Sequence, residues 1–184
     1  MRDNYNTIYK LVAVLRYLWV RLRLGRKLKS SVMGMVGRKC YFHVSKGGGL
    51  GFEGRAILCD YAELLSLGDL RIGENLYMNR YSRIICHESI RLGRNVTIAP
   101  FVTILDHDHS YELVEDELRL DGYTTMPVIV GNHVWIGEKS TILKGVKIGN
   151  NVVVGANSLV NSDLPSNCIA AGNPAKVLRM LETA

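Results

Sequence analysis

Two histidines lie close together in the middle of the chain, in a stretch rich in acidic residues. His107 and His109 belong to the segment LDHDHSYELVEDELRLDGYTTMP, which lies between Ile104 and Val130. The unperturbed pKa of histidine is about 6.5, so an imidazole can gain or lose a proton near pH 7. We therefore predict that one of these histidines is catalytic. Because they alternate with Asp108, we expect them to point to opposite sides of the segment, so that only one faces the site.

The sequence holds none of the common motifs of several other enzyme classes. There is no P-loop, no GxGxxG after a strand, no GxSxG and no HExxH. A zinc site of the carbonic-anhydrase type would need three converging histidines. His107, His109 and His133 lack the spacing of such a site, so we expect no catalytic metal.

Cysteine usage indicates the compartment. The four cysteines form no CxxC pair and no disulfide-dense pattern: Cys40, Cys59, Cys86 and Cys168. This usage favours a reducing, cytoplasmic compartment, and we do not expect a cysteine nucleophile.

A period of six residues runs through the second half of the chain. Its lead positions are all Val or Ile: Val130, Ile136, Ile142, Ile148, Val154 and Val160. Glycine follows the lead position at 131, 137, 149 and 155. The period also runs upstream from Ile72 to Ile84, and resumes after a two-residue offset from Leu92 to Ile104. It matches neither a helix nor simple strand alternation, and it is typical of hexapeptide β-helix repeats.

These repeats predict an all-β prism. Each hexapeptide gives one short strand and one corner, three of them make a triangular coil, and the lead aliphatic side chain points inward. Glycine or asparagine takes the tight corner. We expect one interruption, a loop over about residues 105–127 that the prism expels and that carries function. After Pro165 the segment AAGNPAKVLRMLET predicts a Gly-Asn-Pro corner and a short C-terminal helix, with Val177, Leu178 and Leu181 facing inward.

The N-terminal segment predicts a basic amphipathic helix. Residues 1–30 hold eight Lys or Arg against one acid, Asp3, whereas the other 154 residues hold 15 basic and 16 acidic groups. The nearly neutral body argues against a nucleic-acid partner. An apolar stripe, flanked by Trp19, follows helical spacing: Ile8, Leu11, Leu15, Leu18 and Leu22. The stripe fits either packing on the protein's own domain or a partner subunit, or contact with an anionic membrane surface.

Length and hydropathy limit the alternatives. The chain has 184 residues, 47% of them hydrophobic, which suits one globular domain with an appendage. The longest apolar stretch, Leu11 to Val20, is interrupted by Arg16 and is too short to span a bilayer. It also lacks a signal-peptide cleavage site. We divide the chain into a helical appendage, residues 1–30, and a prism domain, residues 31–184.

Three segments resemble the hexapeptide-repeat acyltransferases: IAPFVTILDHDHSY, VGNHVWIG and AAGNPAKVLR. Within that superfamily the sequence is similar to the sugar O-acetyltransferases of the galactoside, maltose, nodulation and polysaccharide type. The resemblance is strong from about Leu70 to Leu181, weaker from Val36 to Leu70, and absent over the first 30 residues. It implies a left-handed parallel β-helix, a homotrimer with active sites between subunits, and acetyl-CoA as co-substrate.

The resemblance also implies roles for individual residues. The family's general base corresponds to His109, with His107 as the alternate. The acceptor-binding asparagine corresponds to Asn79 in YMNRY, and Tyr77, His87 and Tyr123 are assigned to the acceptor as well. His87 replaces an acid of the galactoside-type members, so that substrate is not assumed.

The same resemblance implies a set of cofactor contacts. Trp135 lines the groove, backbone groups at Gly137, Gly155 and Ala156 meet the pantetheine amides, and Lys176 and Arg179 meet the CoA phosphates. Glu138 and Asn161 occupy cofactor positions that are often Ser and Thr in the family.

The function implied is transfer of acetyl from acetyl-CoA to a hydroxyl of a sugar or polysaccharide precursor, by direct attack on the thioester and without a metal. The alternatives are an antibiotic or xenobiotic O-acetyltransferase on the same fold, a zinc enzyme of the carbonic-anhydrase type, and a non-catalytic trimeric scaffold. The expected location is cytoplasmic, with peripheral contact at the inner face of the membrane through residues 1–30 as the alternative for the helix.

Overall fold

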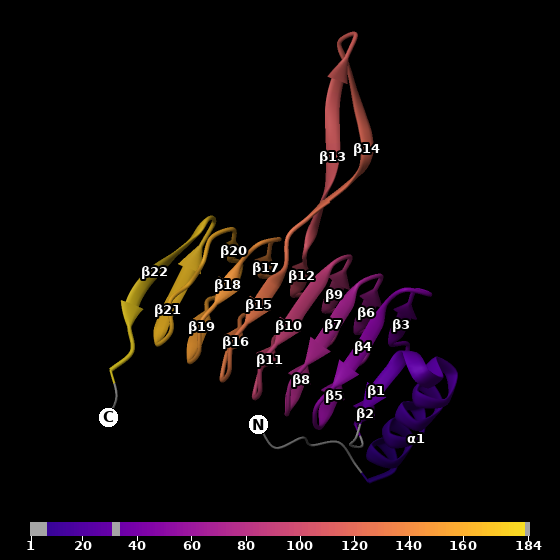
Figure 1. Cartoon of the computed structure of the whole chain (residues 1–184). Coiled ribbons are helices and arrows are strands. Elements are labelled where there is room, and N and C mark those ends of the chain that lie inside the picture. Colours follow the sequence, from indigo (N-terminus) through magenta and orange to yellow (C-terminus); the bar gives the residue numbers. More distant parts are fainter. Residues whose placement is uncertain (1–6, 31–33, 183–184) are drawn as a thin grey trace.

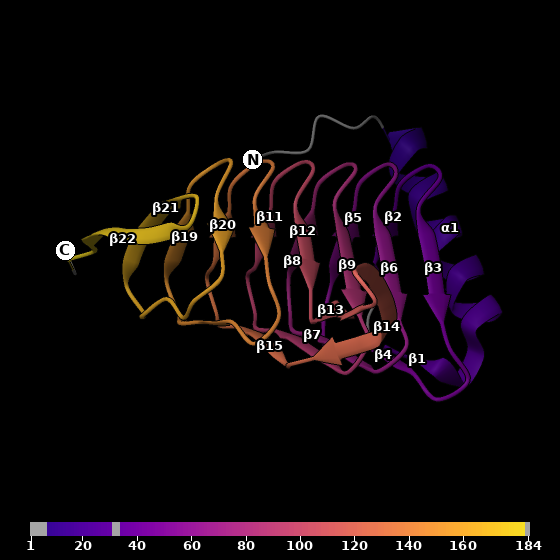
Figure 2. The same cartoon turned by 90° about the horizontal axis from the view of Figure 1, so that it is seen from above.

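The repeats form a solenoid with three flat sides, each a largely parallel β-sheet (Figure 1). The computed structural model describes residues 7–30 and 34–182. We call the three sheets A, B and C. In each coil the chain passes from sheet A to sheet B, then to sheet C, and returns to sheet A. Seen from above, the coils stand in a row between helix α1 (Thr7–Leu24) and strand β22 (Ala175–Met180) (Figure 2). The predicted parallel β-helix is confirmed.

The strands of each sheet follow one another along the solenoid. Sheet A runs β1 (Leu28–Ser30), β4 (Gly49–Phe52), β7 (Asp69–Ile72), β10 (Ser89–Leu92), β15 (Val128–Val130) and β18 (Lys147–Ile148). Sheet B runs β2 (Met35–Val36), β5 (Ala56–Leu58), β8 (Leu76–Met78), β11 (Thr97–Ile98), β16 (Trp135–Ile136), β19 (Val152–Val154), β21 (Cys168–Gly172) and β22. Sheet C runs β3 (Tyr41–Val44), β6 (Glu63–Ser66), β9 (Arg83–Cys86), β12 (Thr103–Leu105), β17 (Thr141–Ile142) and β20 (Leu159–Val160).

The lead aliphatic residues of the repeat form the core. All six predicted lead side chains are at most 2% exposed: Val130, Ile136, Ile142, Ile148, Val154 and Val160. Identical positions of successive coils lie side by side in the sheets, so these side chains stack in continuous columns along the solenoid axis. Burial of such columns is the main stabilising term for a fold whose coils contact only their neighbours.

The two-residue offset in the sequence has a structural cause. The coils from Phe52 to Ile72 and from Ile72 to Leu92 are twenty residues long, whereas the coil from Trp135 to Val153 is eighteen residues long. The extra residues lie where the chain turns from sheet C to sheet A, a position that we call the C–A corner. They lengthen that corner in the coils next to the loop.

The glycines after the lead residues are required by stacking rather than by an unusual dihedral angle. A Cβ on Gly73 would lie 2.6 Å from the carbonyl carbon of Gly93 in the next coil. The left-handed conformation falls two residues later, on Asn75 (φ 58°) and Asn95 (φ 56°). Glycine therefore permits close approach of coils, and asparagine makes the turn.

Helix α1 covers the N-terminal end of the solenoid. It packs through Ala13, Tyr17 and Val20, which are buried, and the short 3-10 turn η1 (Gly25–Lys27) leads from it into β1. Among the described residues, none of the helices has the length and apolar character needed to cross a membrane.

The predicted C-terminal helix is wrong. Residues Ala175–Met180 form β22, which pairs antiparallel with β21 after a tight turn around Gly172 (φ 110°). Val177 and Leu178 are 41% and 66% exposed rather than turned inward. The free edge of β21 offers unpaired backbone N–H and C=O groups, and a returning strand satisfies them where a helix would not.

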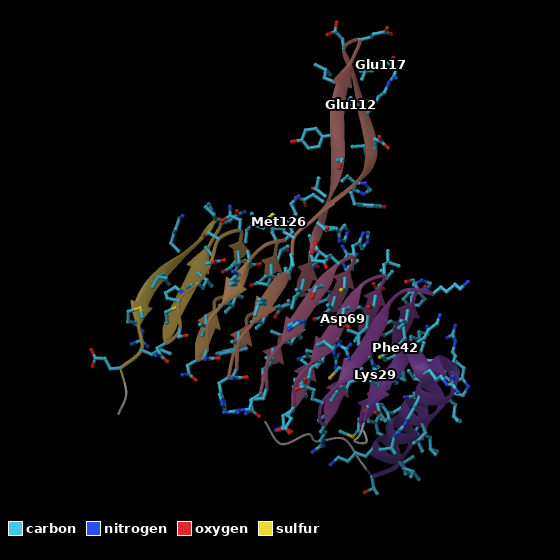
Figure 3. All side chains as sticks on the ribbon, viewed as in Figure 1. Lys29, Phe42, Asp69, Glu112, Glu117 and Met126 are labelled. Atoms are coloured by element: carbon cyan, nitrogen blue, oxygen red, sulfur yellow. The ribbon has the colours of Figure 1, made fainter. Side chains whose placement is uncertain are left out.

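The expelled loop is a long hairpin rather than an irregular segment. Strands β13 (His107–Val114) and β14 (Glu117–Thr125) pair antiparallel and project from the prism as an arm (Figure 1). Glu112 and Glu117 lie near its far end, and Met126 lies at its base (Figure 3). The hairpin starts and ends at the C–A corner, so its base is fixed by the coils around it.

Candidate active site

The C–A corner carries the same two positions in three successive coils, and their residue types change along the solenoid. The pairs are Ser66–Leu67, Cys86–His87 and Asp106–His107, each twenty residues after the last. This register stacks the imidazole rings of His87 and His107, with centroids 3.6 Å apart and planes within 5°. The longer upstream coil thus creates a histidine pair at the point where the hairpin begins.

Asp106 is the fixed point of this corner. Its side chain is fully buried, and its carboxylate accepts hydrogen bonds from the backbone N–H groups of His87 (2.7 Å), Glu88 (2.9 Å) and Ser89 (2.8 Å). It also lies 3.5 Å from Nδ1 of His107. A buried carboxylate with several charge-assisted donors holds its surroundings rigidly. Asp106 therefore fixes both the corner under His87 and the first residue of the hairpin.

His107 and His109 lie on the same side of the hairpin, around Tyr123. Tyr123 pairs with His109 across the two strands, with ring centroids 4.6 Å apart, and it meets the edges of His87 (4.7 Å) and His107 (5.6 Å). The expectation that the two histidines point to opposite sides is wrong. Residues two apart in an extended strand share a face, because side chains alternate with a period of two.

The histidines differ in accessibility. The His107 side chain is 14% exposed, and its buried Nδ1 has no hydrogen-bond partner, whereas His109 is exposed. Burial, followed by the nearby His107, lowers the pKa of His87. Burial therefore favours the neutral form of His87, and His109 is the exposed imidazole of this cluster.

Lys144 joins the hairpin to the next coil. Its Nζ lies 3.1 Å from the Asp108 carboxylate and also donates to the Thr124 hydroxyl. Asp108 and Thr124 face each other across the two strands. A single cation thus bridges both strands of the hairpin at the level of His109.

The cysteine beside the cluster is not an activated thiol. Cys86 is buried, and burial together with Asp106 raises its pKa to about 12. Burial also raises the pKa of Cys40 to about 11 and that of Cys168. All four cysteines are free. Thiols with raised pKa values are poor nucleophiles at pH 7.

The structure places the predicted acceptor residues His87 and Tyr123 in the histidine cluster, whereas Asn79, Tyr77 and most of the predicted cofactor residues lie on a different side of the molecule. Asn79 ends β8 at the B–C corner, where the chain turns from sheet B to sheet C, and its Oδ1 accepts a hydrogen bond from Arg80 N (2.8 Å). Tyr77 lies on the outer face of sheet B, two strands away from Trp135. Within one protomer, Asn79 and His109 are therefore separated by the width of sheet C.

The predicted cofactor residues follow one line along sheet B. Trp135 is 54% exposed on its outer face and pairs with Val153, which is followed by Ile169 and then Arg179 on β22. Lys176 lies on the same edge strand. The residues at the adjoining B–C corner complete the set: Gly137, Glu138, Gly155 and Ala156. A Cβ on Gly137 would lie 2.6 Å from Ala156 N, so stacking alone already requires glycine there.

Two residues considered at the sequence level lie elsewhere. Asn161 follows β20 at the C–A corner of a later coil, away from the other cofactor residues. His133 occupies the corner between sheets A and B with φ 57° and faces Asn95, so it does not converge with His107 and His109. Within residues 7–30 and 34–182, no group of three His, Cys, Asp or Glu side chains is arranged to hold a metal ion.

Sequence reasoning missed Asp106 and Lys144. Asp106 was missed because the side chain of an acidic residue in an acidic loop is expected to be exposed to solvent. In the structure this side chain points into the coil and is buried. The twenty-residue spacing of Ser66, Cys86 and Asp106 was the available signal. Nothing in the sequence around Lys144 indicated its role, because its partners Asp108 and Thr124 lie far from it along the chain.

The chain matches the family model for the bacterial transferase hexapeptide (six repeats) over residues 127–162. It is 42% identical over 112 residues to a galactoside O-acetyltransferase of Escherichia coli (strain K12), covering 60% of this chain and 54% of the relative. It is 37% identical over 119 residues to the putative lipopolysaccharide biosynthesis O-acetyl transferase WbbJ of the same strain, covering 61% of each chain. The chain thus spans between half and two thirds of these curated relatives.

Solved structures show the same architecture. A hexapeptide-repeat-containing acetyltransferase from Vibrio cholerae O1 biovar eltor, complexed with acetyl coenzyme A, is similar with a TM-score of 0.62 and 25% identity, over 90% of this chain and 79% of that chain. The repeats, the solenoid and these relatives together show that the chain is similar to the hexapeptide-repeat transferases in sequence and in fold.

Proposed function

We propose that the chain is an acetyl-CoA-dependent O-acetyltransferase acting on a hydroxyl of a sugar or polysaccharide precursor, with His109 as general base. The observation that carries the proposal is the division of the site residues between two edges of sheet C. The histidine cluster lies at the C–A corner, and Asn79 with the cofactor line lies at and beyond the B–C corner. Two protomers side by side would bring one edge of each together.

His109 suits the role of base better than His107. It is exposed, whereas the His107 ring is held between Asp106 and the stacked His87 ring. We assign His107 and Asp106 as positioning residues that fix the base of the hairpin. Tyr123, which contacts all three imidazoles, limits the rotation of the His109 ring.

The chemistry needs no covalent enzyme intermediate. His109 removes the proton of the acceptor hydroxyl as its oxygen attacks the thioester carbonyl carbon. The tetrahedral intermediate then collapses, the C–S bond breaks, and the imidazolium returns the proton to the leaving CoA sulfur. Backbone N–H groups are the donors expected for the oxyanion. Positioning of the two substrates supplies the remainder of the rate enhancement.

A homotrimer is part of the proposal, since one prism leaves the two halves of the site apart. The outer face of sheet C supports it. Three aliphatic residues pair across neighbouring strands there, next to the histidine corner, and a fourth directly follows the next strand: Leu65, Ile85, Leu105 and Leu143. The hairpin also exposes apolar side chains: Tyr111, Leu113, Leu118 and Leu120. A second copy of the chain would cover both surfaces.

The assembly is tested by light scattering. We expect the purified chain to have three times its monomer mass, and Ile85→Glu to yield monomers without activity. Ile129→Glu is the matched control, because Ile129 faces outward from sheet A at a similar level of the prism and is 40% exposed. A stable, active monomer of the unchanged protein would contradict the assembly.

The activity is tested by release of CoA from acetyl-CoA with a panel of acceptors: free sugars, nucleotide sugars and lipid-linked saccharides. The names of the relatives, galactoside and lipopolysaccharide biosynthesis O-acetyltransferases, motivate this panel. We expect acetyl-CoA binding together with turnover on at least one saccharide. Failure to bind acetyl-CoA would favour the non-catalytic scaffold, and turnover only on antibiotic hydroxyls would favour the xenobiotic alternative.

A further inference from the structure

Helix α1 has two apolar faces on opposite sides, and the prism covers one of them. The covered face consists of Ala13, Tyr17 and Val20. It is fixed by polar contacts as well, since Tyr9 donates to Asp60 (2.8 Å) and the Tyr17 hydroxyl bonds to Ser30. The rotation of the helix about its axis is therefore determined by the fold.

The second apolar face points away from the prism. It is the stripe identified in the sequence, and its side chains are exposed: Ile8 (72%), Leu11 (61%), Leu15 (55%), Leu18 (37%) and Leu22 (82%). At 100° per residue these positions centre on the direction opposite to Ala13, within the covered face. Trp19 is 58% exposed at the edge of the stripe. Contiguous exposed apolar surface of this kind marks an interaction site.

Cations flank the stripe and continue beyond the helix. Lys10 and Arg21 lie on one side, and Arg23 lies on the other with its guanidinium 5.4 Å from the Trp19 ring centroid. The sequence TIYKLVAVLRYLWVRLRL of α1 contains no acidic residue. The stripe is thus flanked by positive charge, and no carboxylate of the helix opposes it.

A recess at the end of the helix combines the same two properties. It has a volume of about 620 Å³ and is lined by Leu18, Arg21, Leu22, Gly25, Arg26 and Leu28. Arg26 also lines a neighbouring recess of about 400 Å³, together with Lys27, Lys29 and Arg71, which forms an ion pair with Asp69 in the same lining. Lys29 lies on the sheet A face beside the end of the helix, in the same area as Asp69 (Figure 3). An apolar hollow next to a cationic one matches an acyl chain joined to a phosphate headgroup.

We propose that this face of α1 docks on the surface of an anionic lipid bilayer. The leucine stripe would enter the boundary between headgroups and acyl chains, and the flanking Arg and Lys would meet lipid phosphates. Charge complementarity decides between a bilayer and a second copy of the chain. Two copies that met through this stripe would bring two uncompensated basic clusters together, whereas an anionic surface neutralises one.

Vesicle co-sedimentation of the full chain tests the proposal. We expect binding to vesicles of phosphatidylcholine mixed with phosphatidylglycerol, little binding to phosphatidylcholine alone, and release at high salt. Leu15→Gln combined with Leu22→Gln should weaken partitioning at least about tenfold. Arg21→Gln combined with Arg23→Gln should have an effect of the same order on anionic vesicles.

Two matched double variants serve as controls. Ile129→Gln with Leu178→Gln removes two exposed aliphatic side chains from sheets A and B, and Arg55→Gln with Arg80→Gln removes two cations from corners of the prism. Both should bind vesicles like the unchanged chain. Vesicle binding that survives the stripe variant, or is lost in the variant at Ile129 and Leu178, would overturn the proposal.

Light scattering and thermal unfolding of the same variants complete the test. The stripe variant should keep the mass and melting temperature of the unchanged protein, because its side chains are exposed. A lower mass or a lower melting temperature would show that the stripe is covered within an assembly, and would overturn membrane docking. None of these measurements uses acetyl transfer, so they fail or succeed independently of the proposed enzyme activity.

Discussion

The two edges of sheet C use the same repeating chain in opposite ways. At the B–C corner the coils repeat closely, and outward rings stack in register: Tyr61 on Tyr81 at 4.8 Å and Tyr81 on Phe101 at 5.0 Å. At the C–A corner the residue types change from coil to coil, and one coil expels a hairpin. The difference teaches that regular stacking keeps an edge uniform from coil to coil, whereas a break in the repeat is needed to bring several titratable groups together.

The largest effect is expected from the histidine edge. His109→Ala should lower kcat by about 10²- to 10⁴-fold while acetyl-CoA still binds, because it removes the proposed base but no cofactor contact. Steady-state kinetics and calorimetric binding measure the two quantities. His133→Asn is the control, since Asn75 and Asn95 occupy the equivalent corner elsewhere. If His107→Ala abolished activity and His109→Ala did not, the general base would be His107 rather than His109.

Asp106→Ser would make this corner resemble the coil that contains Ser66. Three backbone N–H groups would lose their charged acceptor. An unsatisfied buried donor costs about 1–3 kcal/mol, so we expect the free energy of unfolding to fall by at least about 2 kcal/mol. Activity should fall too, because the hairpin base would no longer be fixed.

Urea unfolding measures the stability change. Ser66→Ala is the control: it removes a buried hydroxyl at the same position of an earlier coil, and it should change stability less and leave kcat unchanged. Equal losses of stability in the two variants would mean that Asp106 has no special role at this corner.

The ring stack at the opposite edge should contribute stability only. Tyr81→Asn keeps a residue type that tolerates φ 59°, yet it removes both stacking contacts. We expect a loss of about 1 kcal/mol in the free energy of unfolding. Lys139→Asn changes the same corner in a later coil without removing a ring, and its unfolding midpoint should stay constant. A similar loss in both variants would show that the corner, rather than the rings, is sensitive.

The smallest effect concerns pH. The pKa of His87 is lowered in the folded state, so the unfolded chain binds a proton more readily. Stability contributed by neutral His87 is present above the unfolded value of about 6.5 and is lost progressively as the pH falls below it. His87→Leu, which copies Leu67, should flatten the melting temperature between pH 7 and pH 5. An unchanged pH profile would show that His87 is not responsible.

The repeat made most of the fold predictable, because inward positions tolerate only aliphatic residues. It did not predict β22, since Val177, Leu178 and Leu181 fit a helix as well as a strand and only the free edge of β21 distinguishes the two. The histidine loop was predictable as the break in the period. The stacking of His87 on His107 was missed, although the two-residue offset in the sequence predicts it. The offset implies coils of twenty residues, which place positions 67, 87 and 107 next to one another in successive coils.

The side-by-side strands of sheet B also act as a ruler. Five steps separate the strand of Tyr77 from that of Arg179, and neighbouring strands lie about 4.8 Å apart, so the two positions are about 24 Å from each other along the solenoid. Insertion or deletion of one coil between Trp135 and Ile169 would change that length by a single step and leave every corner in register. In a protein built this way, the distance between the positions of Tyr77 and Arg179 can change in steps of one coil, and the local structure at each position stays the same.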